Sequence, residues 1–248
     1  MAFDRARIAR AVGEERYERG RSIASSDAWF ATRGEYGPGS DIELDGILAD
    51  VVHAAFPATG TAAEFVDTIR AFYLEFPSER IFSAKFVQKT NGRLYELTES
   101  EIAPLYRFFG TMLSSDRAEL AEPATRVLRE FFDDSDRVDA AWRAVTASID
   151  SDSGWRHLLM DASGPVPERL KLPVIERFIG DPAFHEAIFG AIMLGVFDLY
   201  GEIERSTAES LLDRILVDVT NPAYVALRKR LADPKPIEPG WQLLRDGS

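Results

Sequence analysis

The chain has three histidines, and two of them lie four residues from an aspartate. Side chains four residues apart share one face of a helix, so His157 can face Asp161 and His185 can face Asp181. An imidazole nitrogen and a carboxylate oxygen suit the same divalent transition metals. These two pairs are the first places where the sequence offers groups for chemistry.

The second pair points to one candidate metal site, made of His185, Glu186 and Asp198. The Glu-x-x-His pattern of di-iron helical bundles is absent from the sequence. Asp181 is also explained as a helix cap, because a proline follows it. We therefore expect no metal and no other cofactor, and we keep a metal-dependent helical-bundle enzyme as an alternative.

Other catalytic signatures are missing from the sequence. It contains no phosphate-binding or dinucleotide-binding glycine motif, no G-x-S-x-G and no H-E-x-x-H. It also has no cysteine, which excludes disulfides, thiolate-bound metals and cysteine nucleophiles. The stretch "FFDDSD" (131–136) is similar to the metal patches of isoprenoid enzymes, but Arg137 replaces their last aspartate. We expect a solvated turn there, and we assign no catalytic residue.

The stretch "KFVQKTNGRLYELTESE" (85–101) differs from the rest of the chain, which reads as helical. Two runs of alternating apolar residues flank Asn-Gly, and a type I′ turn needs a positive φ at both of its central residues. The pattern predicts a β-hairpin over residues 86–97. Phe86, Tyr95 and Leu97 would share the face that packs on the helical body.

The order of elements around this hairpin fits a winged helix. The phrase "NGRLYELTESE" resembles the wing-to-helix passage of many bacterial winged-helix regulators. That resemblance implies that four basic side chains face DNA, namely Arg80, Lys85, Lys89 and Arg93. Residues 61–97 carry as many acidic as basic side chains, whereas a DNA-reading unit is usually basic. Charge therefore favours a hairpin that covers one end of a helical core, and a DNA-binding regulator with a helical effector half remains the alternative.

Most of the sequence contains recognisable signals for the start of a helix. A Ser or Thr followed three residues later by Glu predicts a capping box, and an Asp or Asn before proline predicts a further helix start. Apolar residues recur at helical spacing behind these starts. The sequence thus predicts an all-α fold, with starts at Ser40/Glu43, Thr61/Glu64, Thr98/Glu101, Asp181-Pro182, Ser206/Glu209 and Asn221-Pro222.

One segment, "FHEAIFGAIMLGVFDLY" (184–200), is apolar all round. A helix of that kind is normally surrounded by other helices. The prediction is an irregular multi-helix bundle around a central buried helix at residues 182–204. Residues 1–115 would form an N-terminal helical region with the hairpin and residues 116–248 a C-terminal helical bundle, unless both belong to one compact domain.

The amino-acid composition is that of an ordinary folded protein, since 46% of the 248 residues are hydrophobic and 28% are charged. The longest apolar run covers residues 187–197, which is shorter than the roughly 20 residues of a membrane-spanning helix. The first residues also lack the apolar core of a signal peptide. We expect a cytoplasmic protein that does not enter a membrane.

The net charge of −12 disfavours direct binding to nucleic acid, because phosphates attract basic surfaces. Both ends of the chain are mildly basic and the middle is strongly acidic. Tyr36 and Trp241 lie in candidate surface segments, and aromatic residues often anchor partner surfaces. We therefore expect a non-enzymatic interaction or regulatory protein that uses an acidic surface on a protein partner. That partner would be basic or part of a nucleic-acid-handling complex.

Overall fold

The computed structural model of the protein describes residues 3–25, 40–56, 60–78, 90, 92–197 and 203–232. These residues form thirteen α-helices, a π-helical turn and a 3₁₀ turn, and no β-strand occurs among them. The all-α prediction is therefore confirmed for these ranges. No helix in them combines the length and the apolar composition needed to cross a membrane.

The helices are short to medium in length and follow one another with brief connections. The first part of the chain forms α1 (Arg5–Val12), α2 (Glu14–Ser25), α3 (Ser40–Ala55), α4 (Ala62–Glu75), α6 (Arg93–Glu96), α7 (Glu99–Leu113) and α8 (Ala118–Phe132). The second part forms α9 (Val138–Thr146), α10 (Asp152–His157), the π-helical turn η2 (Leu158–Ala162), α11 (Glu168–Phe178), the 3₁₀ turn η3 (Pro182–Phe184), α12 (His185–Phe197), α13 (Arg205–Leu212) and α14 (Pro222–Ala232).

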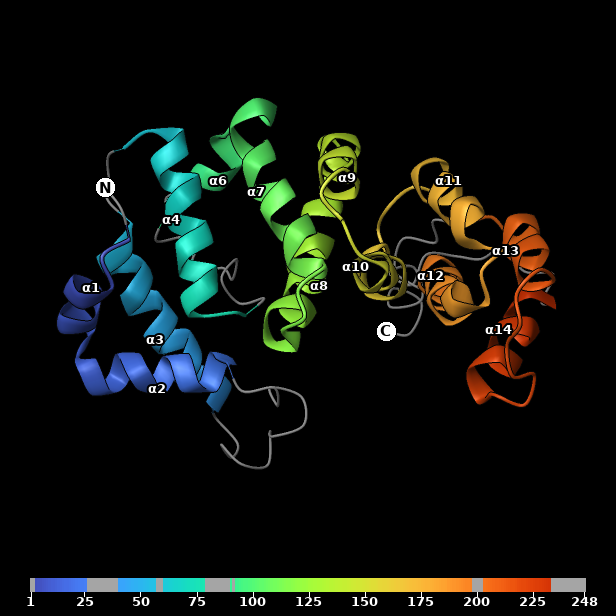
Figure 1. The fold of residues 1–248 in the computed structure, drawn as a ribbon, viewed down its shortest axis with the longest axis horizontal. Coiled ribbons are helices and arrows are strands. Elements are labelled where there is room, and N and C mark those ends of the chain that lie inside the picture. The colour runs from blue at the N-terminus through green and yellow to red at the C-terminus, as the bar shows by residue number, and fades with distance from the viewer. Residues whose placement is uncertain are drawn as a thin grey trace, which may run out of the picture.

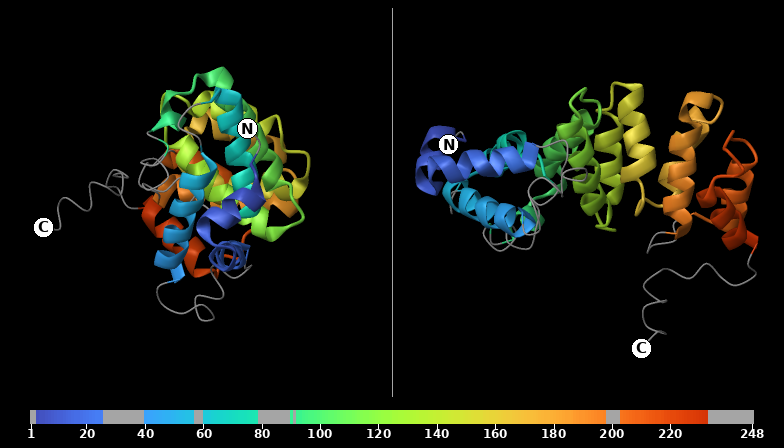
Figure 2. Two further views of the ribbon diagram at one scale, coloured as in Figure 1. Left: turned by 90° about the vertical axis from the view of Figure 1, so that its left-hand side faces the viewer. Right: turned by 90° about the horizontal axis from the view of Figure 1, so that it is seen from below.

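The helices succeed one another along the long axis of the molecule in chain order, from α1 at one end to α13 and α14 at the other (Figure 1). The view from below shows the same succession (Figure 2). Helices that pack closely are mostly near each other in sequence: α1, α2 and α3 pack together, α7 packs on α4, α8 and α9, and α12 packs on η2 and α13. The predicted boundary at residues 115/116 falls between α7 and α8, which are in direct contact.

Aromatic rings link α4, α7 and α8 in the middle of the stack. The Phe109 ring lies 4.9 Å from the Tyr73 ring and 5.8 Å from the Phe131 ring, and Phe131 lies 5.1 Å from Tyr106. All four rings are buried. Edge-on ring pairs contribute about 0.5–1.5 kcal/mol each beyond the burial of their area. These contacts fix the two long helices that carry one of the candidate sites described below.

Several predicted helix starts are confirmed, because hydrogen bonds within a few residues determine them. Thr61 and Glu64 form a reciprocal capping box at the start of α4. Before α7, the Glu101 carboxylate accepts the Thr98 backbone N–H at 2.8 Å. The two proline starts hold as well, since each preceding side chain accepts a backbone N–H two residues on, at Asp181 and Asn221.

Of the two other predicted starts, the one at Ser40 coincides with the first residue of α3, and the one at Ser206 lies just inside α13. The Glu43 carboxylate accepts hydrogen bonds from Arg19 at 2.6 and 3.0 Å, and so connects α3 to α2. Helix α13 begins at Arg205, with Glu204 as its N-cap, so the capping box predicted at Ser206 is wrong.

The β-hairpin predicted over residues 86–97 is wrong in its second half, which is the helical turn α6. A strand would place Tyr95 and Leu97 on one face. Leu94 and Leu97 are buried instead, and Tyr95 is exposed. Two buried residues three positions apart require a helical turn, because a strand would place them on opposite faces.

Gly92 adopts the left-handed conformation before this turn, with φ of 70°. The positive φ predicted from the Asn-Gly pair is therefore present at Gly92, but the turn leads into a helix and not into a strand. A winged helix needs a second strand at this position, and α6 occupies its place. The rest of the predicted hairpin, residues 86–89 and 91, lies outside the described residues.

Helix α12 is buried as predicted, but it does not lie at the centre of the whole molecule. It packs on α10, η2, η3 and α13, in the C-terminal part of the stack (Figure 1). One of its faces, at Phe189 and Met193, lines a pocket. The helix is therefore not enclosed on all sides. The predicted helix extended to residue 204, of which residues 198–202 lie outside the described ranges.

Candidate functional site

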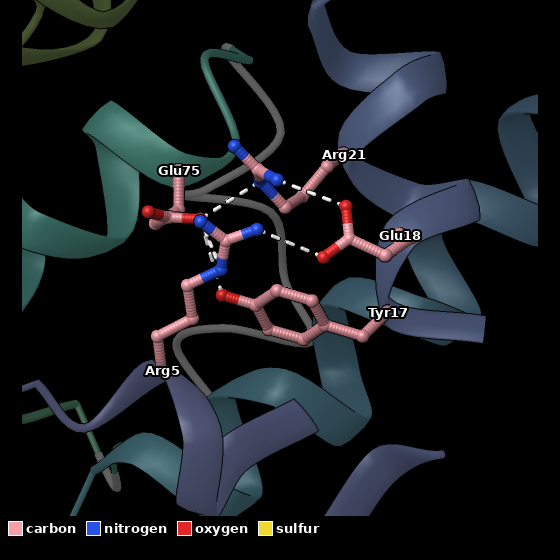
Figure 3. Close-up of polar contacts among 5 residues, drawn as sticks. All are labelled: Arg5, Tyr17, Glu18, Arg21 and Glu75. Atoms are coloured by element: carbon pink, nitrogen blue, oxygen red, sulfur yellow. Dashed lines mark hydrogen bonds and ion pairs between the residues drawn. The ribbon is translucent and has the colours of Figure 1, made fainter. Parts of the chain in front are cut away.

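A polar network connects α1, α2 and α4 at the N-terminal end (Figure 3). Glu75 lies at its centre, with its Oε2 atom 2.8 Å from Arg21 Nε and 3.7 Å from Arg5 Nε. The Tyr17 hydroxyl donates to the same oxygen at 3.3 Å, and burial raises the pKa of Tyr17, so this hydroxyl stays protonated. Glu18 accepts from both arginines at 2.9 Å. Two carboxylates neutralise two guanidiniums here, so the network connects helices and leaves no net charge for a ligand.

A small groove lies between α6, α7, the end of α8 and the turn that joins α8 to α9, and we call it the acidic groove. Its floor is apolar and buried, made of Leu94, Ile102 and Phe131, with Tyr106 beside them. The groove has a volume of about 60 Å³. That is enough room for the end of one inserted side chain.

The rim of the acidic groove is polar and is formed by Tyr95, Glu130, Asp134 and Arg137. Arg137 is engaged, since its Nη2 donates to the Tyr95 carbonyl oxygen at 2.6 Å and its Nε lies 3.6 Å from Asp134 Oδ2. Burial raises the pKa of Tyr106 to about 12, so its hydroxyl is neutral at physiological pH. Within the described residues, Glu130 has no hydrogen-bond or ion-pair partner.

Further carboxylates adjoin this rim in sequence and are exposed, namely Glu96, Asp133 and Asp136. The stretch 131–136 leaves α8 at Phe132 and forms a turn in which Asp134 Oδ1 accepts the Asp136 backbone N–H at 3.1 Å. The solvated turn predicted there is confirmed for residues 133–136, whereas Phe131 and Phe132 belong to α8 and are buried. The rim and the turn beside it therefore carry more carboxylates than cations, and the Arg137 cation is already engaged.

A larger depression, which we call the C-terminal pocket, lies between η2, α12 and the connection from α13 to α14. Its volume is about 400 Å³. Met160, Phe189, Met193 and Val217 supply apolar surface, and Leu216 adds to it at the edge. Its polar lining consists of Glu186, Asp218 and Asn221.

His185, the first of the candidate metal ligands, lies behind this pocket and is buried. Its Nδ1 atom accepts the Leu216 backbone N–H at 2.9 Å, so Nε2 carries the proton and donates to the Ile179 carbonyl oxygen at 3.0 Å. A metal ligand needs a free nitrogen lone pair, and both ring nitrogens of His185 are already engaged. His185 thus connects the loop of the pocket to the start of α12.

The other two candidate metal ligands are Glu186 and Asp198. Glu186 lines the C-terminal pocket, and Asp198 lies outside the described residues. In the other predicted pair, His157 and Asp161, the His157 Nδ1 atom lies 3.1 Å from the Leu113 carbonyl oxygen, and this contact holds the ring to α7. In the ranges that the structure describes, no three His, Asp or Glu side chains come together to hold a metal.

Of the four basic residues predicted to face DNA, only Arg93 falls within the described residues. Its guanidinium lies over the Phe65 ring, 4.9 Å from the centroid, and donates to the Gly60 carbonyl oxygen. Arg93 is therefore held against the start of α4. Arg80, Lys85 and Lys89 lie outside the described residues, as do the predicted aromatic anchors Tyr36 and Trp241.

Neither the acidic groove nor the C-terminal pocket was predicted from the sequence. Each is lined by segments far apart in the chain, so local patterns carry no signal for them. The aspartate-rich stretch 131–136 was a partial signal, because it marked the turn beside the groove. Comparisons with protein-family models, with curated proteins and with solved structures find no match to this chain.

Proposed function

We propose that the protein is a non-enzymatic interaction protein that docks a basic segment of a protein partner in the acidic groove. One observation carries this proposal. Tyr95, with 59% of its surface exposed, stands at the rim of an apolar-floored depression whose carboxylate Glu130 has no partner among the described residues. An exposed aromatic beside a small apolar depression is a typical anchor of a protein interface.

The groove suits the side chain of a lysine or arginine. The methylene stem of such a residue can pack on the apolar floor while its cationic head stays near a carboxylate. Glu130 supplies that negative charge at the rim, because Asp134 already faces Arg137. The Tyr95 ring adds a π face that attracts cations.

The exposed carboxylates next to the rim would act at longer range. Complementary charge mainly raises the rate of encounter and selects among partners. The same negative surroundings repel phosphates, which disfavours a nucleic acid as the occupant. Docking at this site is therefore expected to weaken as salt is added.

Affinity capture from the cells that make the protein tests this function, with and without nuclease. The baits are the wild-type chain, Tyr95→Ala, Glu130→Lys and a control, Glu209→Lys, which makes the same charge reversal at an exposed position on α13. We expect one basic protein to be retained by the wild type and the control and lost by the two groove variants, whether or not nuclease is present. Equal retention by all four baits, or loss of the partner on nuclease treatment, would contradict the proposal.

A further inference from the structure

The C-terminal pocket has the size and the lining of a small-molecule site. Its volume of about 400 Å³ falls within the range of about 300–1,000 Å³ that ligand pockets usually have. Two thioethers and an aromatic ring, from Met160, Met193 and Phe189, line it on the apolar side. Methionine side chains adapt their shape to an apolar ligand and pack well on aromatic groups.

The polar part of the lining carries only negative charge. Glu186 and Asp218 contribute carboxylates, and no lysine, arginine or histidine is among the described residues that line the pocket. Hydrogen bonds from the Thr220 hydroxyl and backbone N–H lower the pKa of Asp218, so Asp218 is ionised at neutral pH. Within the described ranges, the Glu186 side chain has neither a hydrogen-bond nor an ion-pair partner.

The pocket is built on fixed elements. The buried His185 ring holds the Leu216 backbone to the start of α12. Asn221 begins α14 by accepting the Ala223 N–H, and its own N–H donates to the Asp218 carbonyl oxygen at 3.0 Å. On the opposite side, α12 packs on the π-helical turn so closely that a Cβ at Gly190 would lie 3.0 Å from Met160 Cγ. A preformed shape lowers the entropic cost of binding a ligand.

From this lining we infer that the C-terminal pocket binds a small organic cation with an apolar aromatic body, namely an ammonium group that carries an aromatic substituent. The carboxylates of Glu186 and Asp218 face the cation, and the thioethers and the Phe189 ring contact its apolar part. An anion of the same size is repelled, and a neutral analogue loses the charge interaction. This site lies in a different part of the stack from the acidic groove, and the inference does not depend on docking there.

The test measures dissociation constants by ligand-detected NMR titration of the full chain. The probes are 2-phenylethylammonium, the neutral 2-phenylethanol, the anion 3-phenylpropionate and a blocked lysine amide. We expect the ammonium probe to bind about tenfold more tightly than the alcohol, because two carboxylates face the charge, and the anion not to bind. Equal affinity for the ammonium and the alcohol overturns the inference. Affinity for the lysine amide as high as for the aromatic ammonium also overturns it, in favour of a peptide side chain.

Variants test whether the preference for the ammonium probe arises from the carboxylates of the pocket. Glu186→Gln and Asp218→Asn should each weaken the ammonium probe about threefold to fivefold, an effect typical of removing one exposed charge partner, and should leave the alcohol unchanged. Glu209→Gln removes the same charge outside the pocket and should not change either constant. Both pocket carboxylates are exposed, so these variants are expected to fold. An equal loss for Glu209→Gln would show a general effect of net charge and overturn the inference.

Discussion

At the scale of single residues, the protein uses many of its charges to hold helices together. The network around Glu75 is one example, since one carboxylate oxygen meets two guanidiniums and a buried phenol. His185 plays a comparable role with a neutral ring. Glu130 and Glu186, which have no such partner among the described residues, lie in the two sites proposed above.

Glu75→Gln tests how much the polar network around Glu75 contributes to stability. The amide keeps the size of the side chain but removes the charge that faces Arg5 and Arg21. We expect the free energy of unfolding, measured by urea denaturation, to fall by about 1–2 kcal/mol, which is the range for a partly buried charged contact. The exposed control Glu209→Gln should change it by less than about 0.5 kcal/mol. Equal effects of the two substitutions would show that the network contributes nothing specific.

Glu101 gives a prediction for pH. Hydrogen bonds from the Thr98 hydroxyl and backbone N–H lower the pKa of Glu101 in the folded protein. Its contribution to stability is therefore present above the unfolded pKa of about 4.3 and is lost as pH falls through the lower folded value. The stability difference between the wild type and Glu101→Gln should be larger at pH 6 than at pH 3 in urea titrations. A difference that does not change with pH would contradict the assigned role of the carboxylate.

At the scale of elements, the sequence predicted helix starts well where hydrogen bonds between residues close in sequence determine them. The capping box at Thr61 and Glu64 and the helix starts at Asp181 and Asn221 are local hydrogen-bonding patterns, and all three are present. The strand predicted around Tyr95 failed because burial decides between a strand and a helical turn in so short a segment. Leu94 and Leu97 meet the core together only in a helix.

The close approach of α9 to α7 provides a test of element packing. A Cβ at Gly110 would lie 2.7 Å from the Val145 carbonyl oxygen, whereas a Cβ at Gly180 would meet nothing within 4 Å. Gly110→Ala should lower the free energy of unfolding by about 1–3 kcal/mol, because the two helices must move apart. Gly180→Ala should be neutral or slightly stabilising, since alanine restricts the unfolded chain. Urea denaturation of both variants checks this, and a neutral Gly110→Ala would mean that the helices are farther apart than described.

At the scale of the whole molecule, the helices form an elongated stack (Figure 1). The acidic groove is lined by residues of α6, α7 and α8, and the C-terminal pocket by residues of η2 and α12 farther along the chain. The predicted bundle around α12 was too simple, because a pattern of apolar residues shows that a helix is buried but not which helices surround it. The same limit explains why both sites were missed. Met160, Glu186 and Asp218 become neighbours only once the stack has formed.

Docking of a basic protein at the acidic groove is tested most directly by site-specific photo-cross-linking in the producing cells. A photoreactive phenylalanine analogue replaces Tyr95, and in a matched control it replaces Leu74 on α4, which is similarly exposed at 48%. We predict a cross-link to one basic protein from position 95 that is absent from position 74 and is suppressed by Glu130→Lys. The same cross-links from both positions, or a cross-link from position 95 that survives Glu130→Lys, would contradict the proposed function.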